Sequence, residues 1–218
     1  PEGLDSPEEV IRHREFHVSR VKELFGSLDL FIFTLGLTEM WVHKESGTVY
    51  PTAPGTLVGD FNEEIFGFQN AQFSSIIGDF NLFQNVLNKI RGGKSFKCLL
   101  TVSPVPLTAT ASGHHVLPST IYSKSTLRSA AGHLSANKAL IDYFPSYEIV
   151  TNPRLHSTGF ADNLRSVNDE IVETVMRHFF AEHPIINTNS EKSDPPQSST
   201  KTKYDLQCEE EILEEFGT

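Results

Sequence analysis

The sequence predicts an α/β domain, a parallel sheet with helices on both faces, followed by an acidic C-terminal tail. Short apolar runs alternate with longer amphipathic stretches along residues 1–184. This α-β-α-β-α-β-α order is typical of a parallel sheet. The apolar runs are continuous, which is typical of strands covered on both faces. The composition then changes near Pro184, where apolar residues become rare.

The first predicted helix begins at Pro7. Ser6 and Glu9 form a capping-box pattern around it, and proline is favoured at the first helical position. Apolar residues continue at helical spacing to about residue 25. The apolar run 29–34 then predicts a buried strand that ends at a glycine.

The middle of the chain contains a second helix and a second strand. Residues 41–68 carry many turn-forming residues and are expected to be irregular, with a possible short strand at 48–50. Residues 71–91 have apolar residues on one side of a helix, and two glycines end it. The apolar run 96–102 predicts another buried strand.

A loop of about 18 residues, 104–121, follows the second strand without periodicity. Loops of that length inside a compact domain are usually functional or disordered, and this one is not polar enough to favour disorder. The remaining elements are predicted to be a helix at about 123–138, a strand at 146–151 and a helix at about 168–182.

Composition excludes several classes of protein. The net charge of −10 and the pI of about 5.3 argue against a nucleic-acid partner. No apolar run approaches the roughly 20 residues of a membrane span, so no membrane association is expected. Cys98 and Cys208 are too few for a disulfide framework or a zinc site, which favours a reducing, cytoplasmic location. No metal and no cofactor are expected.

Two regions are predicted: an α/β domain at 1–184 and a disordered tail at 185–218. Residues 187–204 hold almost no apolar side chains, so burial cannot offset the entropy of ordering them. The tail carries 8 acidic and 3 basic residues, half of the net charge. Its last part, 205–216, is either a solvated acidic stretch or a segment that docks on a protein partner.

In open parallel sheets, ligands bind beyond the carboxyl ends of the strands. This rule selects three segments, 36–41, 103–120 and 151–167, and it locates a site without defining a reaction. In the first segment, Gly36 allows close approach of a ligand to the backbone. Thr38 and Glu39 add a hydroxyl and a carboxylate; a simple turn is the alternative.

The second and third segments add further polar candidates. Ser103 lies at the start of the long loop, and His114 and His115 are adjacent within it, where either could act as a base. Two histidines without a third ligand are weak evidence for a metal. In the third segment, Asp162 and Arg165 precede a helix and could bind a ligand or form a local ion pair.

Four strings of the sequence together are distinctive: FTLG at 33–36, LTVSP at 100–104, YSKSTL at 122–127 and YFPSYEI at 143–149. In this order and at these distances they resemble the GSCFA family, a branch of the SGNH-hydrolase-like proteins. The resemblance covers about residues 28–182.

The resemblance implies a flavodoxin-like α/β domain that hydrolyses or transfers esters, often acetyl groups on carbohydrate. The family's nucleophilic serine stands in a Gly-Ser-Cys-Phe-Ala block, which these 218 residues do not contain. That block and the first strand are therefore expected upstream of Pro1. Gly36–Glu39 falls where relatives have G-x-N-D, so Thr38 stands in place of the asparagine that donates to the oxyanion.

At the position of the family's catalytic base, this chain differs from many relatives. Many relatives carry D-x-x-H before the last helix, whereas this chain has Asp162 and, three residues later, Arg165. Arginine stays protonated and cannot accept a proton from serine. His115, or else His114, would then serve as base, or this subgroup has lost hydrolysis.

The leading hypothesis is an SGNH-like esterase or acyltransferase, such as an acetyltransferase, that acts on an ester of a carbohydrate-like substrate. The 218-residue chain alone is expected to be inactive. The first alternative is a non-catalytic module that binds a sugar or an anion through Arg165 and the 104–120 loop. The second is an interaction domain whose acidic tail binds a protein.

Overall fold

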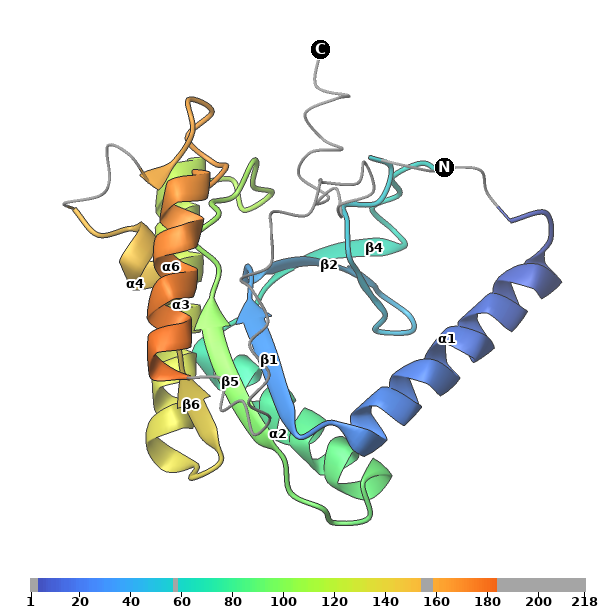
Figure 1. The fold of residues 1–218 in the computed structure, drawn as a ribbon. Coiled ribbons are helices and arrows are strands. Elements are labelled where there is room, and N and C mark those ends of the chain that lie inside the picture. The colour runs from blue at the N-terminus through green and yellow to red at the C-terminus, as the bar shows by residue number, and fades with distance from the viewer. Residues whose placement is uncertain (1–3, 57–58, 154–158, 184–218) are drawn as a thin grey trace. The chain divides into compact units, whose positions relative to one another are not determined.

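The computed structural model describes residues 4–56, 59–153 and 159–183 (Figure 1). The tail predicted at 185–218 lies outside these residues. The helices and strands, in chain order, are α1 (Pro7–Ser27), β1 (Leu30–Leu35), β2 (Glu39–His43), β3 (Val49–Tyr50), β4 (Phe66–Asn70), α2 (Phe73–Ile90), β5 (Lys97–Val102), α3 (Val116–Asn137), β6 (Ile141–Tyr143), α4 (Ser146–Val150) and α6 (Asp169–Glu182).

The described chain divides into two compact units, each made of segments distant in sequence. The first unit contains α1, β1, α2, β5, most of α3, β6 and most of α4. The second contains β2, β3, nearly all of β4, the segment between β5 and α3 with the first turn of α3, and α6.

The first unit is built on a parallel three-stranded sheet flanked by helices, which confirms the predicted α/β class. The strand order is β1-β5-β6, and both pairings are parallel. In register, Phe31 lies beside Cys98 and Leu35 lies beside Val102. Figure 1 shows the three strands side by side.

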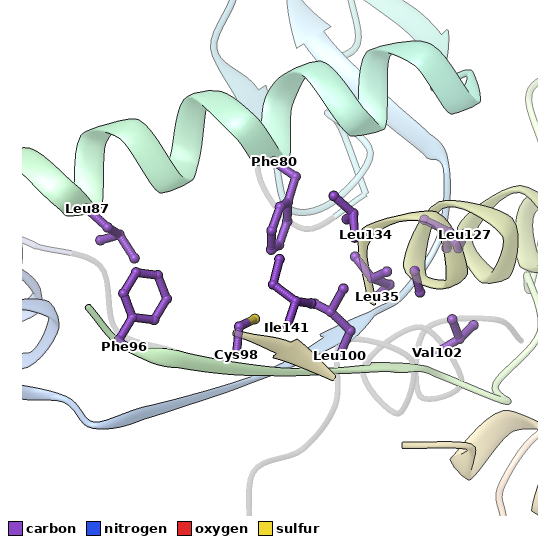
Figure 2. Packing of buried hydrophobic residues seen from close by; sticks show 11 residues of the cluster. Leu35, Phe80, Leu87, Phe96, Cys98, Leu100, Val102, Leu127, Leu134 and Ile141 are labelled. Atoms are coloured by element: carbon purple, nitrogen blue, oxygen red, sulfur yellow. The ribbon is translucent and has the colours of Figure 1, made fainter. Parts of the chain in front are cut away.

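The core of the first unit fills one face of this sheet. Along β5, every second side chain from Phe96 to Val102 points to that face and is buried. Phe80 and Leu87 of α2 and Leu127 and Leu134 of α3 pack against them (Figure 2). Because side chains alternate along a strand, this pattern commits one face of the sheet to α2 and α3.

The opposite face of the sheet carries the polar side chain of Thr101. Its hydroxyl is hydrogen-bonded to that of Ser146, which begins α4. The Ser146 hydroxyl also donates to the Val102 carbonyl at 3.1 Å. The short helix α4 is thereby tied to the carboxyl end of β5.

Helix α1 begins as the sequence predicts and is anchored at its C-terminal end. Ser6 accepts a hydrogen bond from the Glu9 amide at 3.2 Å, and Pro7 is the first helical residue. At the other end, the ring centroids of Phe25 and Phe83 lie 5.9 Å apart. Arg91 donates to the Phe25 carbonyl at 2.7 Å. None of the residues of α1 is buried.

The second unit contains an antiparallel sheet of order β3-β2-β4. The short strand expected at 48–50 is present as β3, whereas β2 and β4 fall in the region expected to be irregular. Trp41 packs edge-on against Phe61 and Phe68, with ring centroids 5.2 and 5.7 Å apart. Aromatic side chains brought together from separate segments stabilise this sheet, and local sequence patterns do not show such pairing.

The predicted strand at 146–151 is wrong, because residues 146–150 form helix α4. The third parallel strand is instead the three-residue β6, which precedes it. A short apolar run fits a strand or a buried helical turn equally well by periodicity, so tertiary contacts decide. The Ile149 amide donates to the Pro145 carbonyl at 3.0 Å, which closes the first helical turn.

Two further features differ from the prediction. Helix α3 begins at Val116, so the loop after β5 is shorter than expected. Strand β1, predicted to be buried, is only partly buried: it lies at an edge of the three-stranded sheet, and Ile32, for example, is 51% exposed.

Among the described residues, no helix is both long enough and apolar enough to cross a membrane. The buried thiol of Cys98 lies in the core of the first unit. Burial raises its pKa to about 11, which keeps the thiol protonated and unreactive near neutral pH.

Replacing Leu87 by alanine should lower the free energy of unfolding by about 2–5 kcal/mol, because its side chain is 2% exposed and fills the core. Leu82→Ala is the matched control on the same helix, where leucine is 62% exposed. We expect that control to change stability by less than about 0.5 kcal/mol. Denaturant unfolding measures both, and equal losses would contradict the assignment of the core face of α2.

Candidate functional site

Thr38 lies just beyond β1, is 0% exposed and uses all its polar groups within the first unit. Its amide donates to the Ser123 hydroxyl at 2.8 Å. Its own hydroxyl donates to the Asn70 side-chain oxygen at 2.6 Å. Its carbonyl accepts from the Ala71 amide at 2.8 Å. Thr38 therefore joins the end of β1 to α3 and to the end of β4.

Gly36, two residues earlier, is held from the same helix. The Lys124 amino group donates to the Gly36 carbonyl at 3.0 Å, and the lysine is 1% exposed. Burying an amino group is unfavourable unless it is hydrogen-bonded. Ser123 and Lys124 are adjacent in sequence, so one turn of α3 positions both ends of the Gly36–Thr38 segment.

Ser103 lies at the end of the neighbouring strand, β5. Its amide donates to the Leu35 carbonyl at 2.9 Å, which extends the parallel pairing of β1 and β5 by one bond. Its side chain is half-buried. Gly36 and Ser103 thus both follow the carboxyl end of the sheet in the first unit, as topology predicts.

In the second unit, a chain of hydroxyl groups ends on the carboxylate of Glu39. Thr110 donates to Glu39 at 2.7 Å, and its hydroxyl lies 2.7 Å from that of Ser112. A hydroxyl has one hydrogen, so Ser112 must donate to Thr110. Ser119, whose hydroxyl lies 3.1 Å from that of Ser112, continues the chain to the first turn of α3. These bonds order the loop that precedes α3.

His114 and His115 are both exposed at the start of α3. The Nδ1 atom of His115 accepts a hydrogen bond from the Leu117 amide at 3.1 Å. Helices leave their first amides without intrahelical partners, and His115 satisfies one of them. In the neutral imidazole, the proton is then on Nε2.

Asp162 and Arg165 belong to a tight turn before α6. The side-chain oxygen of Asn163 accepts from the amides of Arg165 and Ser166, at 3.0 and 2.9 Å. Leu164 has a φ of 59°, a left-handed conformation that is uncommon outside glycine. Asp162 is exposed, and Arg165 is half-buried.

The residues selected from the sequence fall into both units. Gly36, Thr38 and Ser103 belong to the first unit, and the other five belong to the second. Each group is organised by its own hydrogen bonds. That all of them line one site stays a prediction.

The sequence analysis missed three residues that fix the end of β1: Asn70, Ser123 and Lys124. The signal for two of them was present, because Ser123 and Lys124 are in the YSKSTL string. Asn70 could not be found this way, since it lies 32 positions from Thr38 and joins it only in the folded chain.

The sequence analysis also missed a cluster of side chains that connects the YSKSTL string of α3 with the YFPSYEI string of β6 and α4. Arg128, which directly follows YSKSTL, forms an ion pair with Glu148 of YFPSYEI. Tyr143 donates to Glu148 at 2.8 Å, and the Arg128 guanidinium lies 4.1 Å from the centre of the tyrosine ring. Burial, and then the hydrogen bond to Glu148, raises the pKa of Tyr143 above its usual range. These contacts clamp α3 to β6 and α4.

Within the described ranges, no group of three or more histidine, cysteine, aspartate or glutamate side chains is placed to hold a metal ion. The polar groups gathered at the end of β1 are hydroxyl, amide and amino groups, and hydrogen bonds within the first unit join them to one another.

Comparison with known proteins identifies the family. The GSCFA family model matches residues 4–179, and the chain belongs to that family. No curated protein and no solved structure matches the chain.

Replacing Thr38 by valine should lower the free energy of unfolding by roughly 1–3 kcal/mol, because it removes a buried hydroxyl and leaves the Asn70 oxygen without its donor. Thr34→Val, at an exposed position of β1, is the control and should be close to neutral. Thermal or denaturant unfolding compares the two. If both variants were equally stable, the bond between Thr38 and Asn70 would not hold the end of β1.

Proposed function

We propose that this GSCFA-family chain is an SGNH-like hydrolase or acyltransferase domain that acts on an ester of a carbohydrate-like substrate. The observation that supports it most is the fixed polar segment at the end of β1. Gly36 and Thr38 are held there by buried side chains of α3 and by Asn70. Stabilising an oxyanion requires donors whose positions are set before the reaction begins.

In this proposal, the segment around Gly36 supplies the oxyanion side of the reaction. Thr38 acts indirectly, since its amide and hydroxyl donate within the protein. Its hydroxyl donates to the oxygen of the Asn70 amide, so the NH₂ group of Asn70 would be the donor to the oxyanion. Ser103 adds a hydroxyl at the end of the adjacent strand. The family's Gly-Ser-Cys-Phe-Ala block would supply the nucleophilic serine.

The base of the proposed reaction is His115, with His114 as the alternative. Each is exposed, and Arg165 cannot take this role because a guanidinium stays protonated. For His115 to accept a proton through Nδ1, the Leu117 amide must first release it. Asp162 and Arg165 would bind polar or anionic groups of the substrate, and Glu39 would order the loop through Thr110.

The second candidate function is a non-catalytic module that binds a sugar or an anionic ligand. The arginine at position 165, where many relatives have a histidine, favours it, because a guanidinium binds carboxylate or phosphate in a bidentate manner. Both functions would use the same polar segments. The two functions differ in that only the hydrolase or acyltransferase requires a serine activated as a nucleophile.

A fluorophosphonate probe on a protein that carries the Gly-Ser-Cys-Phe-Ala block together with these residues separates the two functions. We expect labelling that is lost when the serine of that block is replaced by alanine. We expect His115→Ala to slow labelling and aryl acetate hydrolysis by about 10²–10⁴-fold, the usual contribution of a general base. His178→Ala, an exposed histidine on α6, is the control and should have no effect.

The 218 residues alone should neither react with the probe nor hydrolyse the ester, since they hold no serine in a Gly-Ser-Cys or Gly-Asp-Ser context. If the block-containing protein stays unlabelled while it is folded, the esterase proposal fails and the binding-module function is favoured. Hydrolysis by the 218 residues that Ser103→Ala abolishes would place the nucleophile within them.

A further inference from the structure

An apolar stripe on α1 continues out of the core of the first unit and is left uncovered by the described residues. At about 100° per residue, Ile11, Val18 and Phe25 lie on one line along the helix. Phe25 packs into the core, whereas Ile11 is 56% and Val18 is 53% exposed. Val10 and Leu24, beside this line, are also exposed. Helices of this kind derive most of their stability from covering such a face.

One basic side chain lies within this stripe: Arg14, between Ile11 and Val18. Lys22 and the acidic Glu15 lie together along one border. Arg20 lies on the opposite side of the helix, where it forms an ion pair with Glu23 at 2.8 Å. The charge within the stripe is therefore positive, which suits an apolar partner that is acidic.

We propose that the acidic segment 205–216 of this chain covers the exposed part of the α1 stripe. This segment has six acidic and no basic residues, together with four apolar side chains. Spaced as a helix, the four apolar residues would share one side, with two acidic residues, Asp205 and Glu209, among them. The segment would thus bring two negative charges to the α1 stripe, which carries the positive charge of Arg14. The apolar residues are Leu206, Ile212, Leu213 and Phe216.

A long connection tethers the acidic segment to the described part of the chain. Residues 184–204 separate the segment from the last described residue. Fully extended, 21 residues span about 70 Å, and as a flexible chain their root-mean-square span is about 25 Å. Tethering also gives the segment an effective concentration in the millimolar range.

A second copy of α1 is a poorer occupant of the stripe. Pairing two copies along this stripe would bring the Arg14 side chain of each copy against a stripe that carries the same charge. Like charges at a helix interface are destabilising. The acidic segment removes this repulsion and supplies the apolar side chains. The inference goes beyond the proposed function and does not depend on it.

Disulfide formation with the native Cys208, which lies inside the segment, tests the contact. We would introduce cysteine into the full 218-residue chain as Ile11→Cys or Val18→Cys on the stripe, and as Ser19→Cys off it. Under mild oxidation of dilute protein, at least one stripe variant should form the intramolecular bond about tenfold faster than Ser19→Cys, because a disulfide needs Cα atoms within about 7 Å. Cys98 is buried and will not compete.

Equal rates for stripe and control variants would overturn the proposal. So would cross-linking mainly between chains, with a rate that rises with protein concentration, since a second copy would then be the occupant. Exchanging the charges of Arg14 and Glu209 provides the second measurement. Arg14→Glu in the Val18→Cys or Ile11→Cys chain should lower the rate of disulfide formation, and adding Glu209→Arg should restore that rate. A rate that does not respond to either change would also contradict the docking of the acidic segment.

Discussion

The hydrogen bond from the buried Lys124 amino group to the Gly36 carbonyl is the contact on which the candidate site depends most. A strand that ends at a glycine would otherwise leave its last residues free to vary, since glycine restricts the backbone least. Lys124 removes that freedom, and its neighbour Ser123 holds the amide of Thr38. The helix that completes the core of the sheet thereby also sets the backbone at the end of β1.

The features that the sequence predicted correctly are those that local patterns determine. The start of α1 follows from Ser6, Pro7 and Glu9, and β5 follows from an apolar run that is buried almost throughout. The strand predicted at 146–151 failed because a short apolar run does not distinguish a strand from a helical turn. Only contacts such as those of Ser146 with β5 decide that residues 146–150 are helical.

The same distinction applies to the site. Topology correctly selected Gly36 and Thr38 as residues at the end of a strand, but it could not reveal that Thr38 is fully buried. The partner that Thr38 orients, Asn70, comes from an antiparallel strand in a region with no clear sequence pattern. Membership of the GSCFA family agrees with the strings that contain Lys124 and Glu148. The structure gives both residues a role in joining α3 to its neighbours.

The most direct test of the central role of Lys124 is the stability of Lys124→Met together with amide hydrogen exchange at Thr38. We expect a loss of about 1.5–3 kcal/mol and faster exchange at Thr38, because the Gly36 carbonyl loses its donor. Lys89→Met, at an exposed position of α2, should change neither quantity. A Lys124→Met variant as stable as the unmodified chain, with unchanged exchange at Thr38, would contradict the account.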